Sequence, residues 1–154
     1  MDITDLLEPE SVVFNLKAGS KKQVLQALAR HAAETTGLHE RLIFDTLLER
    51  ERLGTTGVGD GVAIPHGRIG EIDRISGLFA RLKDPVDFDS VDGKPVDLLF
   101  LLLAPAQAGA DHLKALSKIS RLLRDRDNCE KLRGAKSADA LYALLSSGGT
   151  SQAA

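Results

Sequence analysis

The sequence predicts a mixed α/β (α+β) fold, built as a three-layer α/β/α domain around a mixed β-sheet. Segments with helical periodicity stand both before and after a group of short apolar segments. One of these, residues 98–104, is apolar at every position, which is typical of a central strand covered on both faces. The chain of 154 residues suits one domain, which we place at residues 1–146. The expected order of elements is β-α-α-β-β-β-α-α-α.

The first third of the chain predicts one strand and two helices. Residues 11–16 are rich in β-branched and aromatic side chains, as strands are. A helix should begin after Ser20, because serine at the N-cap and Gln23 three residues later form a capping box, and Gly37 should end it. A second helix should end at residues 53–54 and has one apolar face, formed by Leu42, Ile43, Leu47 and Leu48.

The middle of the chain predicts a loop and three strands. Residues 55–61, TTGVGDG, are expected to be a loop. Residues 62–64 form a minimal strand that ends at Pro65, since proline cannot donate to a ladder. Residues 75–82 form the next strand, and a polar connection over residues 83–95 separates it from the central strand.

The last third predicts three helices and a tail. A helix over residues 110–124 is expected to turn five apolar side chains inward, namely Leu113, Leu116, Ile119, Leu122 and Leu123. Two shorter helices should follow, near residues 128–133 and 137–145. Residues 147–154 have too little apolar surface to bury, so we expect a disordered tail.

Composition and charge exclude several classes of function. The net charge of −2 offers no bulk electrostatic argument for binding nucleic acid or an anionic membrane. The single Cys129 excludes an intrachain disulfide and a multi-cysteine zinc site. The first residues lack the pattern of a signal peptide, and the longest apolar run is too short to cross a bilayer. We therefore expect a cytoplasmic protein without membrane insertion.

The glycine-rich stretch at residues 58–68, VGDGVAIPHGR, resembles nucleotide-binding loops only in part. A Rossmann fingerprint needs a third glycine where Val62 stands, and it needs the order strand, loop, helix. A P-loop needs a final Gly-Lys-Ser/Thr, which this stretch lacks. The chain also has no Gly-x-Ser-x-Gly elbow, so a serine hydrolase is disfavoured together with nucleotide binding.

The histidines differ in their sequence setting. His31 and His39 lie within or at the start of predicted helices and fit an ordinary helical role. His66 follows a strand end, and its flanking glycines let another molecule approach closely. Neutral imidazole dominates near pH 7 and is a competent nucleophile. Taken alone, the pattern fits a structural histidine at position 66 at least as well as a functional one.

Two further residues are candidates for a site at His66. His112 lies in the first turn of a predicted helix, where backbone N–H groups favour anions, although a capping or exposed histidine explains it equally well. Arg50 belongs to a charge run that fits a solvated helix end, but this end leads into the glycine loop, where a guanidinium could reach a phosphate. A metal site of His66, His112 and Asp60 ranks well behind, because short ligand spacing is missing.

The chain resembles the EIIA domains of the bacterial phosphotransferase system, of the fructose/mannitol type. The resemblance rests on residues 50–68, RERLGTTGVGDGVAIPHGR, and on residues 104–120, APAQAGADHLKALSKIS, and it extends over about residues 6–145. Within the family the chain is most similar to the nitrogen regulatory branch, EIIA-Ntr, in SKKQVLQALA after the first strand and in stopping after one domain.

The resemblance implies a phosphoryl acceptor and two supporting residues. His66 matches the histidine that carries the phosphoryl group, usually on Nε2. Arg50 and His112 match the residues that flank it and steady the phosphate, and Arg50 fits that position better than Arg52. No cofactor and no metal are implied, because the phosphoryl donor is another phosphohistidine.

The resemblance also implies supporting roles for the loop. Thr55 and Thr56 match a Ser/Thr pair whose hydroxyls bond to the phosphate or to the loop itself. Gly59 and Gly61 keep the loop open to a partner, and Asp60 stands where relatives often have asparagine. An acid at that position adds negative charge near a phosphate.

The implied partner is an HPr-like phosphocarrier protein that donates the phosphoryl group. In the nitrogen regulatory branch, the phosphorylation state would control binding to target proteins, such as potassium-transport or sensor-kinase components. The alternative is an EIIA component of fructose- or mannitol-type sugar uptake, which passes the phosphoryl group to an EIIB domain. A binding module that accepts no phosphoryl group is a third possibility.

Overall fold

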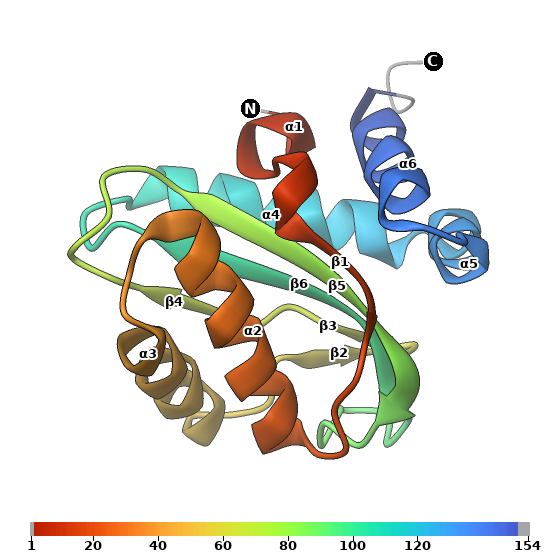
Figure 1. Ribbon diagram of the computed structural model, residues 1–154, viewed down its shortest axis with the longest axis horizontal. Helices are drawn as coiled ribbons and strands as arrows, with labels where there is room; N and C mark the ends of the chain where they lie inside the picture. Colours follow the sequence, from red (N-terminus) through yellow and green to blue (C-terminus); the bar gives the residue numbers. More distant parts are fainter. Residues whose placement is uncertain (1, 151–154) are drawn as a thin grey trace.

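The computed structural model describes residues 2–150 and places a mixed sheet between two layers of helices (Figure 1). The strands of this part of the chain are β1 (Val12–Leu16), β2 (Gly57–Gly59), β3 (Val62–Ala63), β4 (His66–Arg68), β5 (Ser76–Val86) and β6 (Val96–Ala104). Its helices are α1 (Ile3–Leu6), a 3-10 turn (Pro9–Ser11), α2 (Lys21–Thr36), α3 (Glu40–Arg52), α4 (Ala110–Arg124), α5 (Arg126–Gly134) and α6 (Ala138–Thr150). The predicted three-layer α/β fold is confirmed.

The sheet has the order β1-β5-β6-β3-β2, and β4 pairs with β6 beyond the end of β3. Strand β6 runs parallel to β3 and β4 and antiparallel to β5, while β1 is parallel to β5. Strands β3 and β4 therefore lie in line along the same edge of β6. This arrangement fixes His66, which is half-buried, opposite Leu102 of the central strand.

Two separate apolar cores lie on the two faces of the sheet. Leu99, Leu101 and Leu103 of β6 belong to the core under α2 and α3. Leu98, Phe100 and Leu102 alternate with them and pack with α1, α4, α5 and α6 on the other face. Figure 1 shows α2 in front of the sheet and α4 behind it. The apolar run of β6 is thus a central strand buried on both faces, as its sequence predicts.

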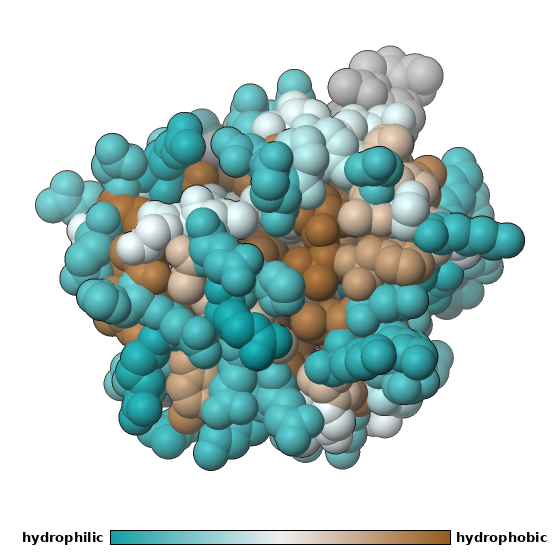
Figure 2. All heavy atoms as spheres, viewed as in Figure 1, coloured by the Kyte–Doolittle hydropathy of each residue, from teal (hydrophilic) through white to brown (hydrophobic). Residues whose placement is uncertain are grey.

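On the face of the sheet that α2 and α3 cover, the hydrophilic sides of these two helices face solvent. Figure 2 shows this face covered mostly by hydrophilic side chains, with hydrophobic atoms visible in its middle. Helix α2 has the predicted ends, because the Ser20 hydroxyl accepts from the Gln23 N–H and Gly37 adopts a φ of 77°. The Gln23 side chain accepts from the N–H of Gly19, one residue before the N-cap.

Residues 57–68 contain three short strands, of which the sequence predicts only the middle one, β3. Residues 57–59 form β2, which pairs antiparallel with β3. Asp60 and Gly61 connect them with φ values of 56° and 81°, the two positive values of a tight hairpin turn. His66 begins a third short strand, β4, and is not in a loop. The expected loop over residues 55–61 is therefore wrong in part.

Other element boundaries also differ from expectation. Strand β5 continues to Val86, four residues beyond its predicted end. Helix α1 and the 3-10 turn at Pro9–Ser11 precede β1 and have no counterpart in the prediction. Helix α6 continues to Thr150, which places residues 147–150 of the expected disordered tail in a helix. Residues 151–154 of that tail lie outside the described residues.

Helix α4 has the predicted bounds but presents a different face to the core. Leu113, expected to point inward, is 65% exposed. His112, its neighbour, is only 6% exposed and takes the inward position. The buried stripe consists of His112, Ala115, Ile119, Leu122 and Leu123, which follow helical spacing as well as the predicted set does.

Candidate functional site

The ring of His66 is held in one tautomer by a backbone carbonyl two residues earlier in the chain. Its Nδ1 lies 2.8 Å from the carbonyl oxygen of Ile64, and a carbonyl can only accept. Nδ1 must therefore carry the proton of the neutral ring, and it donates to Ile64. The lone pair of the ring is left on Nε2, which faces Arg50.

Arg50 reaches the free nitrogen of His66 from the last turn of α3. Its Nε donates to His66 Nε2 at 3.4 Å, and its Nη1 donates to the Gly54 carbonyl at 2.9 Å. The neighbouring Arg52 is exposed. The structure thus places Arg50, and not Arg52, beside His66.

Helix α3 comes close to β4 because the strand has a glycine there. A Cβ atom on Gly67 would lie 2.6 Å from Cγ2 of Thr46, a distance that side chains do not tolerate. The close packing of α3 on β4 brings the end of the helix, and Arg50 with it, over the histidine.

His112 forms the opposite wall of the site. Its ring packs edge-on against His66, with ring centroids 5.8 Å apart and an interplanar angle of 69°. Burial of the ring lowers the pKa of His112, and the nearby His66 and Arg68 lower it further. The neutral form is therefore favoured. Its Nε2 atom is buried and has no hydrogen-bond partner among the described residues.

Thr55 and Thr56 use their hydroxyls within the protein. Thr55 Oγ1 donates to the carbonyl of Phe88 at 2.7 Å and accepts from the N–H of Gly57. Thr56 is buried, and both its N–H and its hydroxyl donate to the carboxylate of Glu51. The sequence leaves open whether these hydroxyls bond to a phosphate or to the protein. In the structure, both donate to acceptors of the protein.

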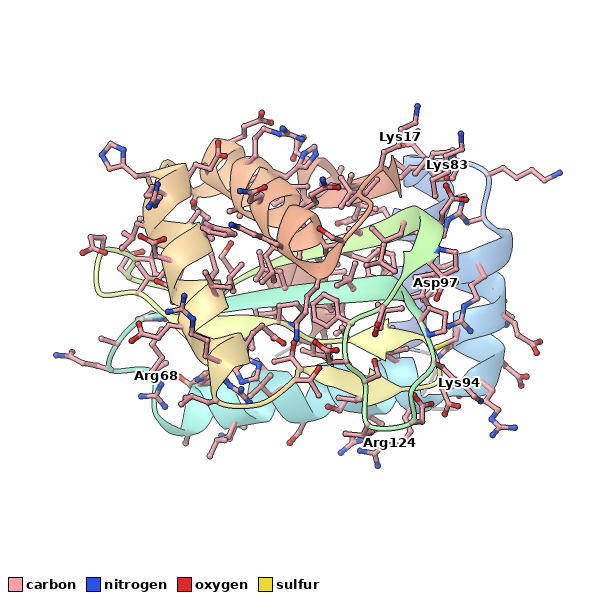
Figure 3. All side chains as sticks on the ribbon, turned by 90° about the horizontal axis from the view of Figure 1, so that it is seen from below. Lys17, Arg68, Lys83, Lys94, Asp97 and Arg124 are labelled. Atoms are coloured by element: carbon pink, nitrogen blue, oxygen red, sulfur yellow. The ribbon has the colours of Figure 1, made fainter. Side chains whose placement is uncertain are left out.

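Asp60 lies at the tip of the β2–β3 hairpin, with its own set of partners. Its N–H donates to Asp92, its carbonyl accepts from Arg133 at 2.8 Å, and its carboxylate lies 3.8 Å from Lys94. Figure 3 shows Lys94 far from Arg68, which follows His66 on β4. The contacts of Asp60 thus hold the β2–β3 hairpin against neighbouring parts of the protein.

The two loop glycines belong to the same hairpin. Gly59 and Gly61 have positive φ values of 105° and 81°, and a Cβ atom on Gly61 would lie 2.5 Å from Nη2 of Arg133. Their structural role is therefore to form this turn. Within residues 2–150, no group of three or more His, Cys, Asp or Glu side chains is placed to hold a metal ion.

Arg68 is a cation near the site that the sequence analysis does not single out. It follows His66 by two positions on β4, so both side chains project from the same face of the strand. Its Nη1 donates to the carbonyl of Ala106, in the connection that leads to α4. Its positive charge helps to lower the pKa of His112. The alternation of His66 and Arg68 would have revealed it, had residues 66–68 been expected to form a strand.

The lowered pKa of His112 predicts how stability depends on pH. The unfolded chain binds a proton on this residue below about pH 6.5, whereas the folded protein resists that proton. The contribution of neutral His112 is fully present above about pH 6.5 and is lost as the pH falls through the lowered pKa. We expect a His112→Gln variant to lose less unfolding free energy than the unchanged protein between about pH 7 and pH 5. Equal losses in urea titrations of the two proteins would contradict the prediction.

Comparison with known proteins identifies the family. The family model described as "Phosphoenolpyruvate-dependent sugar phosphotransferase system, EIIA 2" matches residues 5–148. A "Nitrogen regulatory protein" of Bradyrhizobium diazoefficiens is 61% identical over 145 residues, which cover 94% of this chain and 95% of the relative. A protein of the same name from Escherichia coli is 38% identical over 94% of this chain and 90% of its own length.

Solved structures agree with this result. The crystal structure of nitrogen regulatory protein IIA-Ntr from Neisseria meningitidis has a TM-score of 0.88 and 38% identity, and the match covers 93% of this chain and 98% of that one. In the described part of the chain, no helix has the length and apolar character needed to cross a membrane. The chain belongs to the EIIA type 2 family of the phosphoenolpyruvate-dependent phosphotransferase system, and within it to the relatives of the nitrogen regulatory IIA-Ntr proteins.

Proposed function

We propose that this protein is a phosphohistidine carrier that accepts a phosphoryl group on Nε2 of His66. One observation carries the proposal. The Nδ1–H of His66 is engaged by the Ile64 carbonyl, so the free lone pair is on Nε2, next to the guanidinium of Arg50. A neutral nucleophile and a fixed cation are thus placed together in a half-buried position.

The transfer itself asks little covalent chemistry of the protein. The Nε2 lone pair attacks phosphorus, the N–P bond to the histidine of the donor breaks, and the donor imidazole leaves with that electron pair. The Nδ1 proton of His66 stays on the ring, where the Ile64 carbonyl stabilises the positive charge that the new N–P bond creates. No metal or nucleotide takes part in this step.

The surrounding groups would stabilise the phosphoryl oxygens. Arg50 offers N–H donors in a planar fork that matches phosphate oxygens. The unpartnered Nε2 of His112, when it carries the ring proton, is a further donor beside His66. Arg68 adds a second positive charge. Fixed donors of this kind act where charge develops in the transition state.

We propose an HPr-like phosphocarrier protein as the donor and regulatory proteins as the targets. The regulatory output is supported by the name "Nitrogen regulatory protein" of relatives that are 61% and 38% identical over nearly their whole length. Phosphorylation would then change which target protein binds, since a phosphoryl group adds negative charge and three acceptor oxygens to this surface.

Sugar uptake is a second candidate, supported by one comparison. A protein of Haloferax volcanii named "PTS system fructose-specific EIIA component" is 38% identical over 94% of this chain and 97% of its own length. In this role the phosphoryl group would pass from His66 to an EIIB domain. Transfer from the phosphorylated protein to a purified EIIB domain of the fructose type would favour this candidate.

Intact-protein mass spectrometry tests the proposed carrier function. The protein is incubated with phosphoenolpyruvate, Enzyme I and an HPr-type protein, and each component is left out in turn. We expect a mass increase of one phosphoryl group that is lost in acid, because phosphohistidine is acid-labile. No increase in the complete mixture would contradict the proposal and would favour the binding module.

Replacement of Arg50 should slow the transfer without unfolding the protein. We expect Arg50→Ala to reduce the rate of phosphoryl transfer by about 100-fold or more, as the loss of a fixed donor does at comparable sites. Arg50→Lys should restore part of the rate, since lysine keeps the charge but not the planar fork. Arg52→Ala is the matched control, because Arg52 is exposed on the same helix end. Quench-flow rates for Arg50→Ala equal to those of the control would remove Arg50 from the site.

A further inference from the structure

Glu51 is a buried carboxylate next to Arg50, and the proposed transfer does not use it. Its side chain is 4% exposed, although the charge run in which it stands is typical of a solvated helix end. A carboxylate is rarely buried without partners that compensate for its lost hydration. The partners of Glu51 therefore indicate what this residue does.

Three donors engage the Glu51 carboxylate. The ammonium group of Lys21, at the start of α2, lies 2.9 Å from Oε1. The N–H of Thr56 donates to the same oxygen at 3.1 Å, and the Thr56 hydroxyl donates to Oε2. Glu51 thus ties the end of α3 to α2 and to the start of the glycine loop.

The hydrogen bonds continue from Thr56 to the proposed acceptor. The Thr56 carbonyl accepts from the N–H of Ile64 at 3.0 Å. The Ile64 carbonyl in turn accepts from Nδ1 of His66, and Nε2 of His66 accepts from Arg50. Because Arg50 and Glu51 are consecutive residues, these bonds close a ring that begins and ends at the last turn of α3.

We propose that Glu51 is a positioning residue that fixes Arg50 and the tautomer of His66 through Thr56 and Ile64. This inference rests on the proposed function of His66, which it deepens. Successive helical side chains point about 100° apart, so α3 can direct Arg50 at the phosphoryl site while Glu51 anchors the loop. Lys21 supports this anchor, and its ammonium group also lies 4.8 Å from the centre of the Phe88 ring. The carbonyl of Phe88 accepts a hydrogen bond from the Thr55 hydroxyl.

Glu51→Gln tests the proposal, because the amide keeps the shape but not the charge. We expect the rate of phosphoryl transfer at saturating donor to fall by about tenfold or more, with the KM for the donor nearly unchanged, since misplacement of reacting groups acts on the chemical step. Glu49→Gln, an exposed carboxylate on the same helix end, is the matched control and should transfer at the unchanged rate.

A second measurement needs no phosphoryl donor and separates this inference from the proposed function. Long-range ¹H–¹⁵N NMR spectra report which ring nitrogen of His66 carries the proton. We expect one Nδ1–H tautomer in the unchanged protein and in Glu49→Gln, and a mixture of tautomers in Glu51→Gln. A protein that takes up no phosphoryl group but shows this change would refute the carrier and keep the positioning role.

Thr56→Val covers the case in which Glu51→Gln does not fold. It removes only the hydroxyl donor to Glu51 and retains the side-chain shape and the backbone bonds. We expect a smaller effect in the same direction on both the rate and the His66 tautomer. The inference is overturned if a folded variant at either position has the unchanged transfer rate and a His66 spectrum identical to that of the unchanged protein.

Discussion

The substitution His66→Ala is expected to abolish phosphoryl uptake and to leave the fold intact. Alanine removes Nε2, the ring nitrogen that carries the lone pair beside Arg50. The half-buried side chain makes one hydrogen bond to the Ile64 carbonyl and accepts a long one from Arg50, so its loss should cost only about 1–2 kcal/mol of stability. Intact-protein mass spectrometry with the complete donor system measures the uptake, and circular dichroism checks the fold.

The matched control is His39→Ala. His39 is exposed at the N-cap of α3 and makes no side-chain capping bond there, so its loss should change neither fold nor uptake. His112 is the nearest alternative acceptor, with its ring centroid 5.8 Å from that of His66. Uptake by folded His66→Ala that disappears in the double variant with His112→Ala would move the acceptor to His112.

The substitution Phe100→Ala should cause a large loss of stability. Phe100 is fully buried on the central strand β6, and its ring packs edge-on against Phe79 with centroids 6.4 Å apart. Its ring edge also lies close to Gly77, where a Cβ atom would come within 2.9 Å of it. The truncated side chain leaves a cavity between well-packed neighbours, so we expect a loss of about 3–5 kcal/mol in the free energy of unfolding.

Leu113→Ala is the control for this prediction. Leu113 is 65% exposed, so its truncation should change the free energy of unfolding by no more than about 0.5 kcal/mol. Urea unfolding followed by circular dichroism compares the two variants. Equal losses for Phe100→Ala and Leu113→Ala would contradict the placement of β6 at the centre of two cores.

The larger elements were predictable because their signals are long or chemically specific. The uninterrupted apolar run of β6 and the serine cap of α2 each have a direct physical reading, and both are confirmed. Strands β2 and β4 have three residues each, which is too short for an alternation to stand out. The Asp60–Gly61 pair is a typical hairpin sequence, but its flanking segments are too short to be recognised as strands.

The inward face of α4 was predicted wrongly for a chemical reason. A leucine at position 113 looks like a core residue and a histidine at position 112 does not. The helix is rotated so that His112 is buried against His66, while Leu113 faces outward. Hydrophobic periodicity therefore finds the helix, but it cannot anticipate a polar side chain that is buried because it belongs to a site.

The sequence predicts which residues form the site, but it does not predict the hydrogen bonds that hold them in place. Arg50, His66 and His112 were singled out, and the structure brings all three together. The tautomer of His66 depends on a bond to Ile64 that only the backbone geometry determines. The role of Glu51 depends on Lys21 and Thr56, which pack against it from other elements, so the charge run alone indicates a solvated end.

The most direct test of the account is to locate the phosphorus atom in the phosphorylated protein. Protein labelled with ¹⁵N is phosphorylated by the phosphocarrier system, and the coupling between phosphorus and the ring nitrogens is measured by NMR. We predict coupling to Nε2 of His66, with the proton still on Nδ1. Coupling to Nδ1 of His66, or to a nitrogen of any other residue, would contradict the central claim.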